Sequence, residues 1–284
     1  MIVVTGATGQ LGRLVVENLL KTVAANTIVA AVRDPAKAAD LASRGVLVRR
    51  ADYTQPDSLD SAFAGAEKIL LVSSSELGQR ATQHRAVIDA AVRSGVKLIG
   101  YTSILHADIS VLGLAGEHRE TEAMLKASGL PHVLLRNGWY TENHTASLPA
   151  ALAHGVVLGC AGDGRFSTAS RADYAAAAAA AMTLPNQAGR IYELAGDTAY
   201  TLAEFAAEIS RQAAKPVAYN ELMEADFKNA LTGFGLPEPL AAMLADSDIG
   251  ASKGALFDDS RQLSSLIGRP TTPMSATVAA AIKA

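Results

Sequence analysis

Three glycines near the start of the chain have the spacing of a dinucleotide-binding turn. Gly6, Gly9 and Gly12 follow the β-branched apolar run IVVT, and an amphipathic segment begins within the glycine pattern. Glycine permits positive φ angles and close backbone approaches that a Cβ would prevent, and the free N–H groups at a helix start attract anionic phosphate. The segment GATGQLG is therefore predicted to hold the pyrophosphate of a dinucleotide.

An arginine stands where NAD-binding versions of this arrangement carry an acidic residue for the ribose 2′-hydroxyl, about 20 residues beyond the glycines. The apolar run at residues 27–32 ends in Arg33. A guanidinium there can bind a 2′-phosphate through its fork of donors, and Lys37 can add a point charge. The residue therefore favours NADP(H) over NAD(H). The alternative interpretation is that Arg33 is a solvated residue at the end of a strand with no ligand, and that Asp34 caps the helix that follows.

Composition excludes several classes of function. The 284 residues are 49% hydrophobic and 19% charged, with a net charge of -3, which gives no support to nucleic-acid binding by bulk electrostatics. No run has the length of a membrane span, no charged leader precedes the first strand, and no Cys/His cluster has metal spacing. We expect a cytoplasmic protein without a metal, a membrane or a nucleic-acid partner. A homodimer is allowed, but the sequence does not determine the oligomeric state.

Alternating strands and helices must position these residues. Strands are predicted at residues 45–53, 68–75, 96–103 and 132–140, and helices at 79–94 and 117–128. Such alternation predicts an α/β fold with a Rossmann-type doubly wound parallel sheet, in which ligands bind beyond the carboxyl ends of the strands. Polar residues or glycines follow six of the predicted strands. A ligand cleft is therefore expected along that edge.

The regular rhythm is lost from about residue 141, which predicts a second, smaller part of the chain. A helix is expected through the alanine run at 175–181, and helical pieces are expected in the tail from 201. We assign residues 1–145 to an NADP(H)-binding Rossmann domain, to which the chain returns at about 165–196. Residues 146–164 and 197–284 are assigned to a small, mostly helical C-terminal lobe on the substrate side.

Several segments together resemble the NmrA-like branch of the atypical short-chain dehydrogenases. They are GATGQLG, the DP after Arg33, ADY, SSSELG, TQHRAVIDAAVRSGV, YTSILHA, LLRNGWYTEN and the tail SKGALFDDSRQLSSLIGRPTTP. Within that branch the chain is similar to the bacterial NAD(P)H:quinone oxidoreductases, with the triphenylmethane reductases as near relatives. The resemblance implies direct, flavin-free hydride transfer from NADPH to a quinone or a similar planar electrophile.

The resemblance also implies a set of ligand contacts. The glycine turn would wrap the pyrophosphate, Arg33 would bind the 2′-phosphate, and the serines after the fourth strand would lie on the ribose side. Trp139, Tyr140 and Asn143 would face the substrate, although Trp139 is equally consistent with filling the core. The implied cofactor residues are Gly6, Ala7, Thr8, Gly9, Gln10, Leu11, Arg33, Ser73, Ser74, Ser75, Asn137, Gly138, Trp139, Tyr140, Thr141, Glu142 and Thr168.

The acid–base pair of the classical dehydrogenases is missing. Classical members use Tyr-x-x-x-Lys to exchange a proton with the substrate oxygen, and the corresponding positions here hold Leu114 and His118. His118 is a weak candidate for a proton donor, and Tyr101 and His106 are others. A quinone accepts hydride without a built-in donor. The missing pair leaves two alternatives open, a non-enzymatic NADP(H)-sensing regulator of NmrA type and a reductase of triphenylmethane dyes or related electrophiles.

Overall fold

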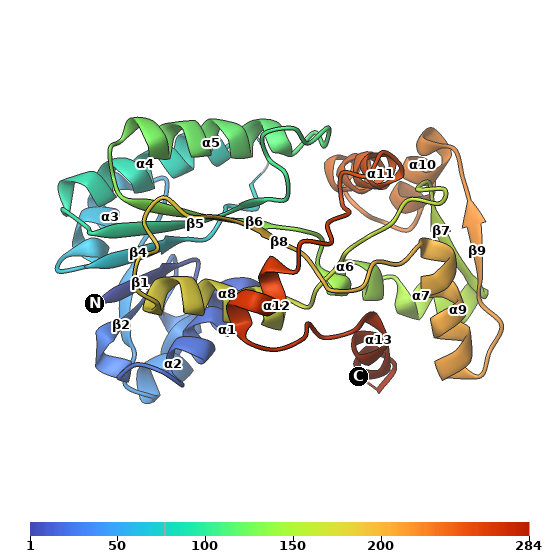
Figure 1. Ribbon diagram of the computed structural model, residues 1–284, viewed down its shortest axis with the longest axis horizontal. Coiled ribbons are helices and arrows are strands. Elements are labelled where there is room, and N and C mark those ends of the chain that lie inside the picture. The colour runs from blue at the N-terminus through green and yellow to red at the C-terminus, as the bar shows by residue number, and fades with distance from the viewer. Residues whose placement is uncertain (77, 284) are drawn as a thin grey trace. The chain divides into compact units, whose positions relative to one another are not determined.

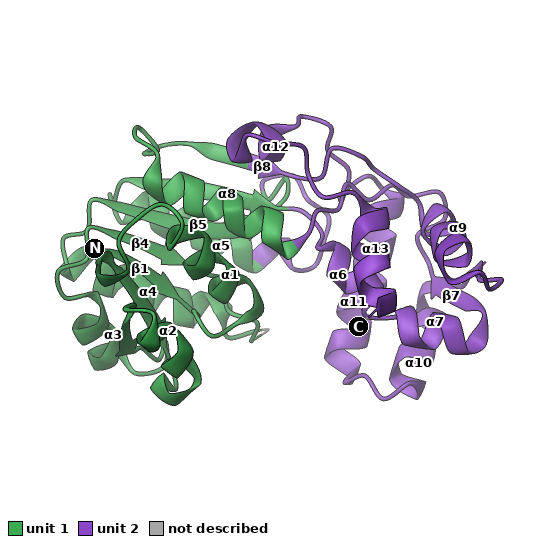
Figure 2. Cartoon of the chain, turned by 90° about the horizontal axis from the view of Figure 1, so that it is seen from below, with its two compact units in different colours: residues 1–107, 117–137, 171–192 green, residues 108–116, 138–170, 193–284 purple. Residues whose placement is uncertain are grey.

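The computed structural model describes residues 1–76 and 78–283. They form two compact units, which Figure 2 distinguishes by colour. Unit 1 consists of residues 1–107, 117–137 and 171–192, and unit 2 consists of residues 108–116, 138–170 and 193–284. The two units are defined by which residues pack together. The domains expected from the sequence are defined instead by whether they bind the cofactor or lie on the substrate side. That domain assignment stays a prediction.

Unit 1 is built on a seven-stranded sheet with the strand order β3-β2-β1-β4-β5-β6-β8 (Figure 1). The strands are β1 (Ile2–Thr5), β2 (Ile28–Val32), β3 (Leu47–Arg50), β4 (Lys68–Leu71), β5 (Leu98–Ile104), β6 (His132–Asn137) and β8 (Ile191–Leu194), whose last two residues belong to unit 2. Neighbours from β3 to β6 pair in parallel. The order reverses at β1, so its carboxyl end and that of β4 flank the crevice where such sheets bind ligands. The Rossmann-type doubly wound sheet is confirmed.

Helices cover both faces of this sheet (Figure 1). One face carries α1 (Gln10–Leu19), α2 (Ala39–Ser43) and α8 (Arg171–Thr183), and the other carries α3 (Pro56–Phe63), α4 (Arg80–Arg93) and α5 (Ala115–Ala127). Phe63, Ile88 and Leu125 bury the second set against the sheet. The alanine-rich α8 lies very close to the sheet, since a Cβ on Gly100 would be 2.8 Å from Met182 Sδ. The helix expected for the alanine run is confirmed.

Unit 2 is mostly helical and contains a second, two-stranded sheet. Strands β7 (Val156–Gly159) and β9 (Ala218–Glu221) pair in parallel. The core of this unit gathers Leu148, Phe205 and Val278. The helical C-terminal region expected from the sequence is confirmed. The helices of unit 2 are α6 (Thr141–Thr145), α7 (Leu148–His154), α9 (Leu202–Ala213), α10 (Glu224–Gly233), α11 (Glu238–Ser252), α12 (Gln262–Ile267) and α13 (Met274–Lys283).

Three elements of the tail are not predicted from the sequence. Strand β9 is short and polar, and it pairs with a strand about 60 residues earlier, so no local pattern marks it. Helix α11 buries small residues and the polar Asp248, which leaves a weak apolar periodicity. Helix α13 also lies outside the expected helices. Three expected strands, at 45–53, 68–75 and 132–140, extend three or four residues beyond the ends of β3, β4 and β6. The polar residues after their apolar centres are not paired in the sheet.

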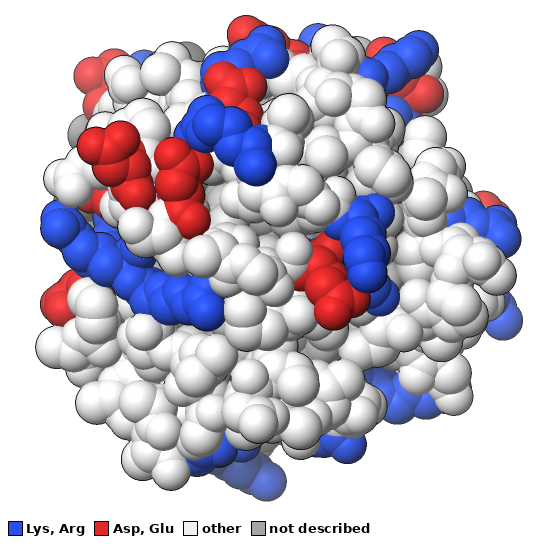
Figure 3. Space-filling model, turned by 90° about the vertical axis from the view of Figure 1, so that its left-hand side faces the viewer, with Lys and Arg blue, Asp and Glu red and all other residues white. Residues whose placement is uncertain are grey.

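Within residues 1–76 and 78–283 no helix has the length and apolarity needed to cross a bilayer, and no group of three His, Cys, Asp or Glu side chains could hold a metal ion. Figure 3 shows Lys and Arg interspersed with Asp and Glu on one face. The expectation of no nucleic-acid partner stays a prediction.

Candidate functional site

The glycine turn after β1 has the geometry of an anion-binding site. Gly6 has a φ of +58, which glycine adopts freely. A Cβ on Gly12 would lie 2.3 Å from Gly6 O, so helix α1 begins directly against the turn. Gly9 is the N-cap of α1 and provides no side-chain cap for the first N–H groups of this ten-residue helix. These donors and the positive end of the helix dipole fit an anionic pyrophosphate.

Arg33 lies at the carboxyl end of β2, close to this turn. Ala7 N donates to Ala31 O (3.4 Å), which joins the turn to β2 just before Arg33. The Arg33 side chain is 72% exposed, and its Nη1 donates to Glu76 Oε1 at 2.9 Å. An exposed guanidinium at this edge fits the proposed 2′-phosphate contact. Its pairing with Glu76 is not predicted from the sequence.

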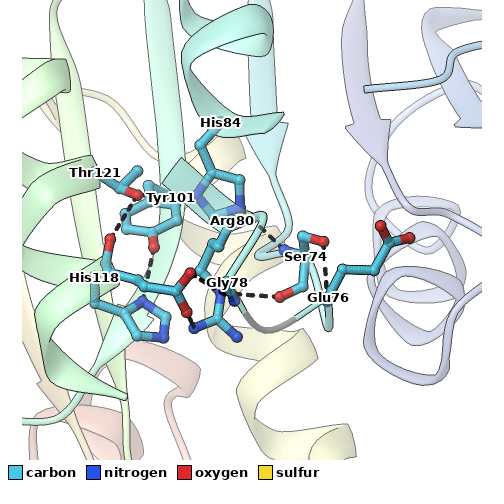
Figure 4. Close-up of polar contacts among 9 residues, drawn as sticks. Ser74, Glu76, Gly78, Arg80, His84, Tyr101, His118 and Thr121 are labelled. Atoms are coloured by element: carbon cyan, nitrogen blue, oxygen red, sulfur yellow. Dashed lines mark hydrogen bonds and ion pairs between the residues drawn. The ribbon is translucent and has the colours of Figure 1, made fainter. Parts of the chain in front are cut away.

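Side chains from two other elements fix the serine segment that follows β4, and Figure 4 shows the contacts of His84 and Arg80 with Ser74. Ser73 N donates to Thr102 Oγ1 of β5 (2.8 Å), and Ser74 N donates to His84 Nε2 of α4 (3.0 Å). Arg80 Nε, at the start of α4, donates to Ser74 O (2.9 Å). The backbone of the segment that is expected beside the ribose is thus held before any ligand arrives.

Glu117 of α5 binds two residues that follow the serine segment, Gly78 and Arg80. Its Oε1 accepts from Gly78 N (3.1 Å), and its Oε2 pairs with Arg80 Nη1 (3.0 Å). The Arg80 side chain is only 7% exposed. A largely buried, hydrogen-bonded ion pair is costly to break from one side. The connection from β4 to α4 is therefore anchored on α5.

The hydrogen bonds around His84 determine its protonation state. Thr121 Oγ1 donates its proton to Glu117 O (2.9 Å), so it must accept from His84 Nδ1 (3.0 Å). His84 is therefore the neutral tautomer with the proton on Nδ1, and its Nε2 lone pair accepts from Ser74 N. Burial, with a contribution from the Arg80 charge, lowers the pKa of His84 to about 3. Protonation of His84 would break the contact with Ser74.

Replacing His84 by glutamine is expected to reduce the acid sensitivity of the fold. The pKa of His84 falls from 6.5 to about 3 on folding, so between these values the folded state binds fewer protons than the unfolded state. Stability therefore falls as pH falls through this window. Between about pH 7 and about pH 5, the wild-type protein should lose about 1 to 2 kcal/mol more unfolding free energy than His84→Gln. Urea denaturation at both pH values measures this difference.

The matched control is His154→Gln, at an exposed histidine at the end of α7. This variant should show the same loss of unfolding free energy on acidification as the wild-type protein. An equal loss in His84→Gln and in the wild-type protein would contradict the neutral, buried state assigned to His84.

His118 lies in α5 and is buried against Tyr101 (Figure 4). The distance between Tyr101 OH and His118 Nδ1 is 2.7 Å. Burial lowers the pKa of His118 well below its ordinary value and raises the pKa of Tyr101 above its ordinary value. Both groups are therefore neutral near pH 7, and His118 is not present as an imidazolium acid. Its role as a proton donor stays a prediction.

Of the residues expected along the nicotinamide half, those from Gly138 to Glu142 and Thr168 come together within unit 2. Thr141 N donates to Ala169 O (3.0 Å), and Ala169 N donates to Trp139 O (3.2 Å). Thr141 Oγ1 and Thr168 Oγ1 are 2.8 Å apart and buried. Two segments that are distant in the sequence thus lie side by side, and Asn143 is the third residue of α6. The other expected residues of this stretch are Gly138, Tyr140 and Glu142.

Asn137, the last residue of β6, leaves a buried polar atom unsatisfied. The residue is 6% exposed, and its Oδ1 has no hydrogen-bond partner among the described residues. Such an atom costs about 1 to 3 kcal/mol unless a donor reaches it. A ligand donor at the carboxyl edge of the sheet would satisfy it. This atom, the close approach at Gly12 and the uncapped start of α1 together fit a bound dinucleotide.

Three residues around the expected cofactor segments are missed by sequence reasoning. Glu76, Arg80 and Glu117 contact partners that lie up to 43 residues away in the chain. Charged residues near helix starts are common, so their types and spacing carry no specific signal. Only the packing of α4 and α5 on the sheet reveals these contacts.

The sequence profile of the NAD(P)H-binding family matches residues 6–185, which is more than half of the chain. This chain belongs to the NAD(P)H-binding family. Quinone oxidoreductase 2 of Escherichia coli strain K12 is 61% identical over 278 residues, which cover 98% of this chain and 97% of that relative. The family resemblance predicted from the motifs is confirmed.

Two solved structures are similar to this NAD(P)H-binding protein over nearly its whole length. An NADPH-dependent quinone oxidoreductase from Escherichia coli, solved in complex with NADPH, has a TM-score of 0.97 and 60% identity and covers 99% of this chain and 100% of its own. The triphenylmethane reductase of Citrobacter sp., complexed with NADP(H), has a TM-score of 0.95 and 38% identity, with coverages of 99% and 100%.

Proposed function

We propose that this chain is an NADPH-dependent quinone oxidoreductase that passes hydride directly to a quinone without flavin. The proposal is carried by the 61% identity, over 98% of the chain, to quinone oxidoreductase 2 of Escherichia coli. The structure of an NADPH-dependent quinone oxidoreductase with NADPH supports the cofactor, since this chain matches it at a TM-score of 0.97. The guanidinium of Arg33 at the end of β2 supports NADPH over NADH.

Several parts of the chain would hold NADPH. The N–H groups at the start of α1 would bind the pyrophosphate, Arg33 would bind the 2′-phosphate, and residues 73–75 would lie beside the ribose. Asn137 to Glu142 and Thr168 would lie along the nicotinamide half, and Trp139, Tyr140 and Asn143 would face the quinone. When bound, NADPH supplies the hydride.

The residues of the chain act by positioning and by excluding water. A quinone that accepts hydride becomes a stabilised quinolate, which takes its proton from solvent, so no tyrosine–lysine pair is needed. Tyr101 and His118 are neutral and hydrogen-bonded to each other, which suits a reaction without an ionised acid at this position. Orientation of the two reactants then accounts for most of the rate enhancement.

Purified protein is expected to oxidise NADPH when a simple benzoquinone is added, and to oxidise NADH much more slowly. The decrease in nicotinamide absorbance measures both rates. A triphenylmethane dye and an enone in the same assay test the alternative acceptors. Binding of NADPH without oxidation by any acceptor would contradict the proposal and would favour a sensing regulator. The quinone-class partner, the cytoplasmic location and a homodimer stay predictions.

A further inference from the structure

The guanidinium of Arg33 contacts a carboxylate that comes from a different strand end. Arg33 follows β2, Glu76 follows β4, and β1 lies between these strands in the sheet. Arg33 Nη1 and Glu76 Oε1 are 2.9 Å apart, and the two side chains are 72% and 44% exposed. An exposed ion pair contributes little to stability. Both charged groups are accessible to a ligand at this edge of the sheet.

Glu76 is held in place by groups other than Arg33. Gln83 Nε2 donates to Glu76 Oε2 (2.6 Å), and Gln83 is 5% exposed on α4. The backbone N of Glu76 also donates to Ser74 Oγ (3.2 Å), as Figure 4 shows. The carboxylate therefore keeps its position when the guanidinium turns to a ligand. Asp52, a second carboxylate whose charge interacts with Arg33, is held instead by Thr54.

A carboxylate at this position acts in opposite directions on the two nicotinamide cofactors. It repels a 2′-phosphate and occupies the guanidinium that would bind it. It accepts a hydrogen bond from a ribose 2′-hydroxyl, which is the chemistry that an acidic residue supplies after the second strand of NAD-binding folds. The sheet edge thus carries a donor for the phosphate and an acceptor for the hydroxyl.

We propose that Glu76 is a specificity-determining residue that weakens NADPH binding, strengthens NADH binding and so narrows the preference set by Arg33. The inference rests on the proposed function, in which Arg33 binds the 2′-phosphate. Glu76→Gln removes the charge and keeps an oxygen for Gln83. Its Kd for NADPH is expected to fall about two- to five-fold, and its Kd for NADH to rise by a similar factor. Fluorescence titration of the full-length protein with each dinucleotide measures both constants.

Glu67→Gln is the matched control. Glu67 is also exposed, but it lies at the amino end of β4 beside the N-terminal amine of Met1 (3.8 Å). Loss of the same charge there should leave both Kd values unchanged. Unchanged constants in Glu76→Gln, or constants that both move in one direction, would overturn the inference. If the wild-type protein bound neither dinucleotide, the cofactor assignment would fail and the inference would fail with it, whereas binding of NADPH without oxidation would contradict only the proposed reaction.

Discussion

Arg33→Ala is expected to raise KM for NADPH about 10- to 100-fold, because it removes a charge-assisted hydrogen bond of about 1.5 to 3 kcal/mol to the 2′-phosphate. NADH has a hydroxyl in place of this phosphate, so its KM should change less than about two-fold. Steady-state oxidation of each cofactor with a fixed benzoquinone concentration gives both constants. kcat with saturating NADPH should stay close to the wild-type value, since the 2′-phosphate that Arg33 is proposed to bind is far from the transferred hydride.

Arg93→Ala is the control for the loss of one exposed arginine. Arg93 pairs with Asp60 at the C-terminal end of α4, and its side chain is 49% exposed. This helix runs away from the carboxyl edge of the sheet, so the variant should keep both KM values. Equal weakening of NADPH and NADH in Arg33→Ala would show that Arg33 does not bind the 2′-phosphate.

Gly12→Ala is expected to lower the unfolding free energy by about 1 to 3 kcal/mol and to weaken NADPH binding at least about 10-fold. The added Cβ would lie 2.3 Å from Gly6 O and 2.8 Å from Gly6 C. Both atoms belong to the backbone of the turn, so the turn itself must move away from α1. That movement displaces the N–H groups expected to bind the pyrophosphate. Urea denaturation and fluorescence titration measure the two effects.

Alanine substitutions at two other glycines provide comparisons for Gly12→Ala. A Cβ on Gly9 would lie 3.1 Å from Gly6 O, so Gly9→Ala should have a smaller effect than Gly12→Ala. Gly233 ends α10, is exposed and would present its Cβ to open space, so Gly233→Ala should leave NADPH binding unchanged. Wild-type affinity in Gly12→Ala would contradict the role given to the close approach of turn and helix.

The sequence alone predicts the sheet because each βα unit carries its own signal. The apolar run before Gly6, the glycine spacing and the amphipathic helix after it are all local features. The same holds for Arg33, whose place after the second strand follows from counting along the chain. Sequence reasoning fails where the pattern is not local, as in β9, which is polar and pairs with a strand about 60 residues away.

The surroundings of the candidate site depend on contacts that no spacing predicts. Arg33 meets Glu76 because β2 and β4 end at the same edge, and Glu117 reaches Arg80 because α4 and α5 pack on the same face. The neutral state of His84 likewise follows from Thr121, which is 37 residues away. Each partner has an ordinary residue type at an ordinary position, so only the packed fold identifies it.

The sequence by itself thus determined the dinucleotide fold, the glycine turn predicted to bind a pyrophosphate, the arginine predicted to favour a 2′-phosphate and the missing tyrosine–lysine pair. These properties depend on residue type and on short spacing, which the chain displays directly. The tertiary structure alone decided which charge faces Arg33, how the segment after β4 is held and which histidines are neutral. These depend on burial and on the distance between groups far apart in the chain, which arise only when helices and sheet pack together.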